Sequence, residues 1–224
     1  MNTMIDWSLY LVTDKELCLG RPLLDIVESA ISGGVSVVQL REKNCTTREF
    51  VDIGKSLLKI LRPKKIPLII NDRLDILLAI GADGLHIGQQ DLHYHDARSL
   101  LDKNSEKKFL LGLSVENIEQ VKEAKNYDLS YMALSPLYST TTKKDAAPPW
   151  GLDGLKMVRQ NTNCPLIAIG GINTQNASEI IKAGANGLAI VSALCSSPSP
   201  QKAAIEFIKT INAAKNEMAQ DNKQ

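Results

Sequence analysis

Three polar side chains at alternating positions, Gln39, Arg41 and Lys43, follow a valine-rich run that is typical of a buried strand. Successive side chains of a strand point to opposite faces, so this amide and these two cations share one face. Charges at a strand end can simply face water. An amide and two cations that converge on one face are better explained by a bound polyanion, and this is the chemistry that the segment predicts.

Two carboxylates, Asp72 and Asp91, follow the next two apolar runs along the chain. Neighbouring strands lie about 5 Å apart, so these side chains can meet above the ends of their strands. Two carboxylates at that range repel each other unless a cation lies between them. Oxygen ligands without thiolate or histidine suit Mg²⁺ shared with a substrate phosphate. Each aspartate could instead cap the following helix, but their joint placement opposite Arg41 and Lys43 favours the metal site.

Glycines mark a second anion site near the end of the chain, where Gly170 and Gly171 follow one apolar run and Ser192 follows another. Glycine allows backbone N–H groups to approach a phosphate, and a helix N-terminus favours its negative charge. The glycines could also serve a tight turn alone. Together with the charged segments, they predict two anion sites in one place, which suits a reaction between two phosphorylated small molecules.

Three further features carry weaker signals. Ser114 ends an apolar run and could donate to an anion or start a helix. The long segment 135–150 has threonines around a lysine pair and resembles a phosphate clamp on a functional loop. His93 and His95 are expected on an exposed helix start, and His86 is expected as a packed or ligand-facing strand residue. No histidine is assigned a catalytic role.

These residues need a scaffold that brings many strand ends together. Stretches such as 30–40, 79–88 and 182–191 repeat one pattern, in which a helix ends in a glycine-containing turn and an apolar strand follows at once. Eight strand–helix units in all predict a (β/α)8 barrel, an α/β fold whose active site lies at the carboxyl ends of the strands. A doubly wound open sheet is the main rival, but no G-x-G-x-x-G follows the first apolar run. The predicted strands are 8–13, 35–41, 67–71, 84–87, 109–113, 130–135, 165–170 and 187–191, and the predicted helices are 22–32, 47–62, 73–80, 94–102, 116–125, 151–161, 174–183 and 200–214.

Length and composition fit one enzyme domain over residues 1–224, with a polar tail at 215–224 that is expected to fray. Lysine and arginine total 26 against 25 aspartates and glutamates, and this balance argues against a nucleic-acid-binding protein. No apolar run reaches the roughly 18–20 residues that cross a membrane, and the first residues do not resemble a signal peptide. Four scattered cysteines favour reduced thiols and a cytoplasmic enzyme. An exposed apolar helix face could form a homo-oligomer, although the pattern assigns none.

In their order and spacing, the motifs resemble the thiamine-phosphate synthase family from Leu9 to about Phe207, nearly the whole chain. Each short motif is weak alone, and the ordered set is specific. The chain departs from the family pattern at Leu134-Ser135 and at 145–150. The motifs that carry the resemblance are QLREK at 39–43, ND at 71–72, IGQQD at 87–91, GLS at 112–114, PLYSTTTK at 136–143, IGGI at 169–172 and VS at 191–192.

The resemblance implies that 4-amino-2-methyl-5-hydroxymethylpyrimidine diphosphate and 4-methyl-5-(2-phosphoethyl)thiazole condense to thiamine phosphate and diphosphate. The implied mechanism is dissociative and Mg²⁺-assisted: a pyrimidine methyl cation forms, and the thiazole nitrogen captures it. Asp72 and Asp91 are the implied Mg²⁺ ligands, and Lys43, Ser114 and Lys143 the implied catalytic residues. The implied diphosphate-binding residues are Gln39, Arg41, Lys43 and Asn71; Ser114 and Lys143 would contact the pyrimidine or its leaving group; Thr140, Thr142, Gly171, Val191 and Ser192 would bind the thiazole phosphate.

Three other functions fit a barrel of this kind. A thiazole tautomerase needs no diphosphate site, and the retained cations and carboxylates argue against it. A sugar-phosphate isomerase, epimerase or aldolase would use an acid–base pair or a buried Schiff-base lysine. A non-catalytic thiamine-precursor binding protein would not need both metal ligands.

Overall fold

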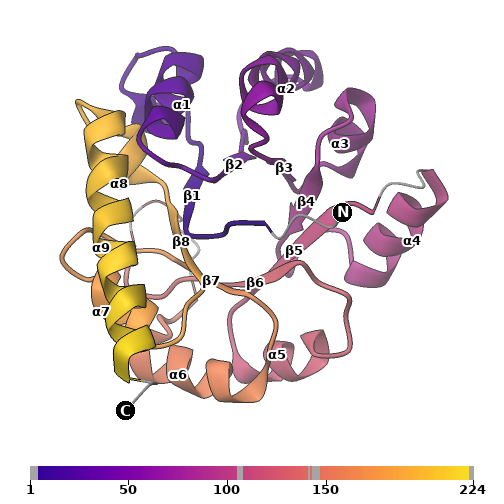
Figure 1. Cartoon of the computed structure of the whole chain (residues 1–224). Helices are drawn as coiled ribbons and strands as arrows, with labels where there is room; N and C mark the ends of the chain where they lie inside the picture. Colours follow the sequence, from indigo (N-terminus) through magenta and orange to yellow (C-terminus); the bar gives the residue numbers. More distant parts are fainter. Residues whose placement is uncertain (1–4, 105–107, 141, 143–146, 222–224) are drawn as a thin grey trace.

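The computed structural model describes residues 5–104, 108–140, 142 and 147–221, and at its centre is a closed barrel of eight parallel strands (Figure 1). Each strand pairs with the next in chain order, and β8 closes the ring against β1, where Leu11 pairs with Ile190. The predicted (β/α)8 fold is confirmed, and the open sheet is excluded. The strands are β1 Leu9–Val12, β2 Val37–Leu40, β3 Leu68–Asn71, β4 Gly84–Ile87, β5 Leu110–Val115, β6 Tyr131–Leu134, β7 Leu166–Ile169 and β8 Gly187–Ile190.

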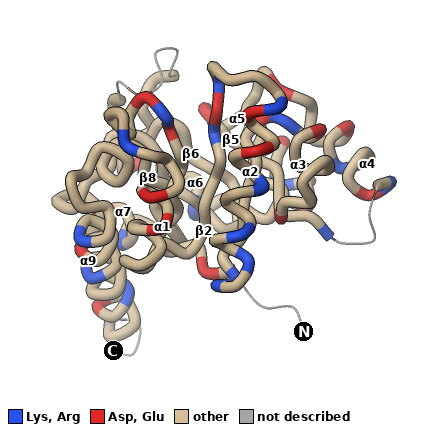
Figure 2. The backbone as a smooth tube through the Cα atoms, turned by 90° about the horizontal axis from the view of Figure 1, so that it is seen from above, with Lys and Arg blue, Asp and Glu red and all other residues tan. Residues whose placement is uncertain are grey.

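The helices lie outside the ring of strands (Figure 1), and charged residues of both signs are interspersed along them and their loops (Figure 2). Local sequence sets their ends: Thr46 and Glu49 form a reciprocal capping box at the start of α2, and Gly81 takes a left-handed conformation after α3. The helices are α1 Leu23–Ser32, α2 Thr47–Leu61, α3 Leu74–Ile80, α4 Tyr94–Asn104, α5 Ile118–Ala124, α6 Gly151–Asn161, α7 Ala177–Lys182, α8 Ser192–Cys195 and α9 Pro200–Asp221, with 3₁₀ turns η1 Glu16–Cys18 and η2 Arg62–Lys64. Apolar periodicity does not predict η1, η2 or α8, because each spans four residues or fewer.

Apolar side chains form two cores, one on each face of the barrel wall. The outer core packs strands against helices, with Leu11, Leu40 and Phe207 almost completely buried. The inner core fills the barrel with alternate strand residues, so the interior is packed rather than open. Because Val37 points inward, Gln39 two positions later does so too. The inner core consists of Trp7, Tyr10, Val12, Val37, Ile69, Tyr131, Ala133, Ile167 and Ala189.

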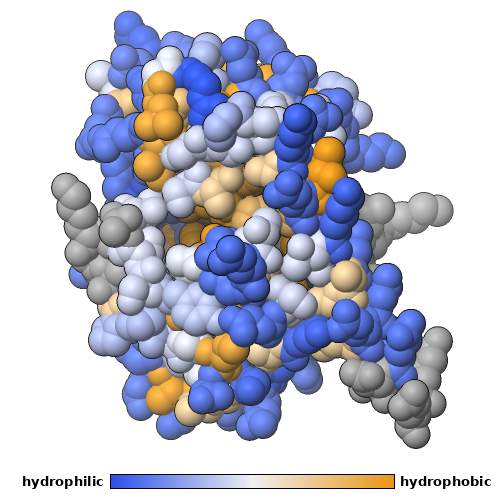
Figure 3. Space-filling model, turned by 90° about the vertical axis from the view of Figure 1, so that its left-hand side faces the viewer, coloured by the Kyte–Doolittle hydropathy of each residue, from blue (hydrophilic) through white to orange (hydrophobic). Residues whose placement is uncertain are grey.

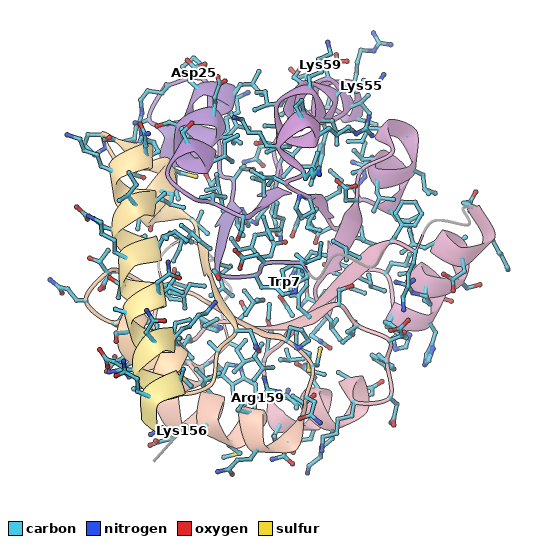
Figure 4. The ribbon with its side chains drawn as sticks, in the orientation of Figure 1. Trp7, Asp25, Lys55, Lys59, Lys156 and Arg159 are labelled. Carbon is cyan, nitrogen blue, oxygen red and sulfur yellow. The ribbon has the colours of Figure 1, made fainter. Side chains whose placement is uncertain are left out.

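Glycines make room for large residues inside this barrel, because Gly112 faces the ring of Tyr131 and Gly187 faces the backbone of Trp7. Trp7 lies within the ring of strands (Figure 4), with its ring centroid 4.7 Å from that of Tyr131. A Cβ atom at Gly112 would lie only 2.1 Å from Cζ of Tyr131, and one at Gly187 would lie 1.7 Å from the carbonyl oxygen of Trp7. Packed aromatic side chains therefore fill the barrel below the carboxyl ends of the strands.

The prediction that residues 215–224 fray is wrong for the part that the structure describes, because α9 continues to Asp221. Met218 packs partly against the outer core, so the apolar face of the helix extends beyond the predicted end. Lys182 on α7 also forms an ion pair with Glu217. Contacts with α7 and the core stabilise a segment whose polar composition alone predicts no order.

No helix in the described part of the chain has the length and apolar character needed to cross a bilayer. Among described residues, the large apolar side chains exposed to solvent, Leu19, Leu100, Met157 and Ile205, come from different segments. Seen from the side of α9, most of the surface is hydrophilic, and hydrophobic residues lie in separate patches (Figure 3). Homo-oligomerisation therefore stays a prediction.

Candidate active site

A cavity of about 170 Å³ opens at the carboxyl ends of the strands. Every predicted site residue that the structure describes lies in its wall, and Lys143 lies outside the described residues. The topology thus gathers residues more than 150 positions apart in sequence, as expected for this end of a barrel. The predicted residues in the wall are Gln39, Arg41, Lys43, Asn71, Asp72, Asp91, Ser114, Thr140, Thr142, Gly171, Val191 and Ser192.

The segment after β2 presents its amide and cations to this cavity at three depths. Gln39 is buried, and its Nε2 donates to the Tyr10 hydroxyl at 2.8 Å. Arg41 is partly buried, and its Nη1 donates to Oδ2 of Asp14 at 3.3 Å. A guanidinium has five N–H donors, so one bond to Asp14 orients Arg41 without exhausting its capacity to bind phosphate. Lys43 is exposed at the mouth.

Asp72 and Asp91 come into direct contact in the cavity wall, as predicted. Burial and the neighbouring Asp91 raise the pKa of Asp72 to about 7, and the opposing effects of Lys43 and Arg41 are smaller. Two carboxyl groups in contact leave unbalanced negative charge when both ionise. A bound cation would remove that penalty.

Backbone geometry aims both acids at the cavity. Asp72 has a φ of +61°, a left-handed conformation that aspartate tolerates better than most residues, and its N–H donates to the His86 carbonyl at 2.8 Å. Oδ2 of Asp91 accepts from the Gly88 N–H at 2.7 Å. Arg73, and not Asp72, is the N-cap residue of α3. The structure therefore favours the metal hypothesis for Asp72 over the helix-capping alternative.

The acid pair fits Mg²⁺. No group of three or more histidines, cysteines, aspartates or glutamates gathers into a metal cage among the described residues. Mg²⁺ commonly binds through one or two carboxylates and completes its octahedron with water and substrate phosphate oxygens. Two contacting carboxylates beside Arg41 and Lys43 match that donor set.

The opposite wall, after β6, β7 and β8, carries no charged side chain among the described residues that line the cavity. Gly170 and Gly171 have φ values of +99° and +65°. A Cβ atom at Gly171 would lie 2.7 Å from Cβ of Tyr138 and 2.8 Å from the carbonyl oxygen of Ser139. Only glycine lets the two loops pack this closely with this backbone conformation.

The long loop after β6 is anchored at its base. The Leu137 N–H donates to the carbonyl of Ile169 at 2.7 Å, which fixes the loop to the end of β7. Farther along, the Thr142 N–H donates to Oγ1 of Thr140 at 3.2 Å, and both threonines line the cavity. The described part of this loop therefore contributes hydroxyls to the uncharged wall.

The predicted site left out three polar residues of the wall, His86, Glu116 and Ser135, although a ligand-facing His86 was one of two expectations. His86 bridges Ser114 and Tyr131 with distances of 2.9 Å to each, and burial lowers its pKa to about 4. Glu116 lies two positions after Ser114, so the alternation that linked Arg41 to Lys43 would have found it.

Ser114 does not start the next helix, because Asn117 caps α5. The remaining two histidines are exposed near the start of α4, as predicted.

Comparisons with known proteins identify the family of this chain. A family model described as thiamine monophosphate synthase matches residues 9–194. A thiamine-phosphate synthase of Syntrophomonas wolfei is 50% identical over 189 residues, which cover 84% of this chain and 88% of the relative. A thiamine-phosphate synthase of Albidiferax ferrireducens is 47% identical over 205 residues, 92% of each chain.

A solved structure leads to the same family. The thiamine phosphate pyrophosphorylase from Pyrococcus furiosus is 32% identical, with a TM-score of 0.85 over 95% of this chain and 99% of that one. The matches include all eight strands and every predicted site residue. The chain therefore belongs to the thiamine monophosphate synthase family of transferase enzymes.

Proposed function

We propose that this enzyme condenses 4-amino-2-methyl-5-hydroxymethylpyrimidine diphosphate with 4-methyl-5-(2-phosphoethyl)thiazole, giving thiamine phosphate and diphosphate. The observation that carries the proposal is the division of one cavity into a charged wall and an uncharged wall. The names of the relatives support the overall reaction. The two walls support the assignment of the two substrates to separate sides of the cavity.

The charged wall would bind the pyrimidine diphosphate. Arg41, Lys43 and the amide of Asn71 supply donors to phosphate oxygens, and Asp72 and Asp91 would bind Mg²⁺. When bound, Mg²⁺ would neutralise charge on the departing diphosphate as a Lewis acid. Arg41 and Lys43 would stabilise the same developing charge.

The uncharged wall would bind the thiazole phosphate. Gly171 and Ser192 bring backbone groups to the cavity, and Thr140 and Thr142 bring hydroxyls. Such neutral donors bind an anion without adding a full positive charge near the reacting carbon. Lys143, which lies outside the described residues, stays a predicted contact of the pyrimidine substrate or its diphosphate.

The proposed reaction needs little proton transfer. The bond between the pyrimidine methylene carbon and the diphosphate oxygen breaks, and the electron pair leaves with diphosphate. The resulting pyrimidine methyl cation accepts the lone pair of the thiazole nitrogen. A carbon–nitrogen bond forms, and atoms and charge balance. Apolar residues of the wall, including Ile169 and Ala189, would exclude water from the cation.

The alternatives fit the cavity less well. A tautomerase has no use for Arg41 and Lys43 beside a contacting acid pair. A Schiff-base aldolase needs a buried lysine, whereas Lys43, the one lysine among the described residues of the wall, is exposed. All four cysteines are unpaired thiols, which supports the further proposal of a cytoplasmic location.

The deciding experiment mixes the purified enzyme with both phosphorylated precursors and Mg²⁺, and follows products by ³¹P NMR and chromatography. We expect thiamine phosphate and diphosphate in equal amounts. Omitting either precursor, or adding excess chelator, should stop the reaction. Isomerisation of a thiazole alone, or turnover that is unchanged in chelator, would contradict the proposal.

A further inference from the structure

A chain of four hydrogen bonds crosses the interior of the barrel directly beneath the cavity. Nε2 of Gln39 donates to the Tyr10 hydroxyl at 2.8 Å, and the hydroxyls of Tyr10 and Tyr131 lie 2.8 Å apart. The Tyr131 hydroxyl lies 2.9 Å from Nδ1 of His86, and Nε2 of His86 lies 2.9 Å from Oγ of Ser114. Both ends of the chain, Gln39 and Ser114, reach the cavity.

The chain has a direction because its first member can only donate through nitrogen. The Tyr10 hydroxyl accepts from Gln39, so its own hydrogen goes to Tyr131, and the hydrogen of Tyr131 goes to Nδ1 of His86. With Nε2 of Gln39 on Tyr10, the opposite direction would leave the hydrogen of the fully buried Tyr10 hydroxyl without an acceptor.

His86 passes this direction on to Ser114. Its two ring nitrogens contact hydroxyls rather than carboxylates, and Nδ1 accepts from the Tyr131 hydroxyl, so Nδ1 carries no hydrogen. A neutral imidazole that accepts at Nδ1 carries its hydrogen on Nε2. Nε2 therefore donates to Oγ of Ser114, and the hydroxyl hydrogen of Ser114 is left to point into the cavity.

We infer that His86 is a positioning residue, which with Tyr131 and Tyr10 fixes the hydroxyl of Ser114 as a hydrogen-bond donor toward a lone-pair acceptor of the bound substrate. The kinetic part of this inference rests on the proposed function, in which that acceptor belongs to the pyrimidine or its diphosphate. The tautomer of His86 does not depend on the proposed function. His86 touches no reacting atom in this arrangement and acts through Ser114.

Packing keeps the chain in register. The rings of His86 and Tyr131 stack at an interplanar angle of 14° with centroids 5.6 Å apart, and Tyr10 meets Tyr131 edge-on. The absence of a side chain at Gly112 provides the space for the Tyr131 ring. A donor that is oriented before substrate arrives needs no reorganisation during the reaction, which is the condition for efficient electrostatic catalysis.

The first test is the tautomer of His86, measured by ¹⁵N NMR of histidine-labelled enzyme without substrate. We expect a protonated Nε2 and an unprotonated Nδ1. Rotation of the Gln39 amide by 180° would place its oxygen on Tyr10 and reverse every bond in the chain. A spectrum showing the hydrogen on Nδ1 would therefore overturn the inference, whatever reaction the enzyme catalyses.

The second test breaks the chain at its centre with Tyr131→Phe, which keeps the ring and does not alter a residue of the cavity wall. We expect a mixture of His86 tautomers and a fall in kcat of about 3–30-fold, the effect of one to two hydrogen bonds, with the KM for the thiazole phosphate nearly unchanged. The control is Tyr94→Phe, which removes a buried tyrosine hydroxyl that accepts from the Asp128 N–H elsewhere in the barrel shell. This control should change neither the tautomer nor kcat.

Two substitutions of His86 distinguish a positioning role from simple packing. In His86→Gln the side-chain amide can place an N–H near the position of Nε2, so Ser114 retains its partner and most of the rate should return. His86→Leu fills the space without a donor and should lose kcat like Ser114→Ala. Equal rates for the glutamine and leucine variants, both folded by circular dichroism, would show that the contact is only structural.

Discussion

The two walls of the cavity offer different physical means of binding an anion. The wall after β2, β3 and β4 brings charged side chains together, where burial and the contacting Asp91 raise the pKa of Asp72 to about 7. The wall after β6, β7 and β8 has no charged side chain among its described residues and relies on glycines and hydroxyls. In the proposed reaction, this division concentrates charge where the leaving group is stabilised and keeps it away from the substrate that supplies a lone pair.

Removal of one acid from the charged wall should have the largest effect on the difference between the two walls. Asp72→Ala should lower kcat by about 10²–10³-fold, because one preorganised electrostatic group at the leaving diphosphate is lost. Mg²⁺ binding, followed by calorimetry in the presence of diphosphate, should weaken in parallel, whereas binding of the thiazole phosphate should persist.

The matched control is Asp75→Ala, three residues further along the chain. Asp75 forms an exposed ion pair with Arg73, and such pairs contribute little to stability. Its removal should leave rate and Mg²⁺ binding nearly unchanged. A folded Asp72→Ala enzyme with a near-normal rate would contradict the proposal that this wall binds Mg²⁺.

Much of this contrast could be predicted from the sequence, because strand periodicity and strand ends are local signals. The alternation that placed Arg41 beside Lys43 needs only a window of five residues, and the glycine pair at 170–171 marks its own turn. In a barrel, every strand end lies on one rim, so local predictions combine into a site. Glu116 was within reach of the same logic.

Other features depend on contacts that no local window contains. His86 meets Tyr131 and Ser114, which are 45 and 28 residues away, and the sequence left it open whether His86 is packed or ligand-facing. The structure shows both. The order of the tail likewise comes from Lys182 and the outer core, and not from the polar composition of residues 215–221.

The pH dependence of the free energy of unfolding tests the protonation state of His86, which lies beneath the charged wall. Burial lowers the pKa of His86 from 6.5 to about 4, so the unfolded chain takes up a proton at a higher pH than the folded enzyme does. The associated stability is complete above pH 6.5 and is lost as the pH falls toward 4, by at most about 3 kcal/mol. Urea unfolding at each pH should show this slope as the difference between the wild type and His86→Gln, because Asp72 and the other acids titrate in both proteins. Equal slopes would mean that His86 is protonated in the folded state.

The uncharged wall should be sensitive to a change in its shape. Gly171→Ala adds a Cβ atom 2.7 Å from Tyr138 at a φ of +65°, so the loop must shift. We expect the KM for the thiazole phosphate to rise about 10-fold, since a strained left-handed alanine costs about 1–2 kcal/mol, with the KM for the pyrimidine diphosphate little changed. Gly20→Ala is the control, because Gly20 also has a positive φ but no atom within 4 Å of the added carbon. A similar rise in both KM values would show that the two walls do not act separately.

The smallest expected effect uses no mutation and separates the walls by ionic strength. Screening weakens interactions of exposed charges, such as Lys43 at the mouth, far more than short contacts from neutral backbone groups. Raising KCl from about 50 to 200 mM at saturating Mg²⁺ should therefore raise the KM for the pyrimidine diphosphate a few-fold and that for the thiazole phosphate less. Lys43→Gln should remove much of the salt dependence of the first constant and leave that of the second alone. If both constants respond equally in the wild type, long-range charge attracts both substrates, and the difference between the walls concerns chemistry at the leaving group rather than binding.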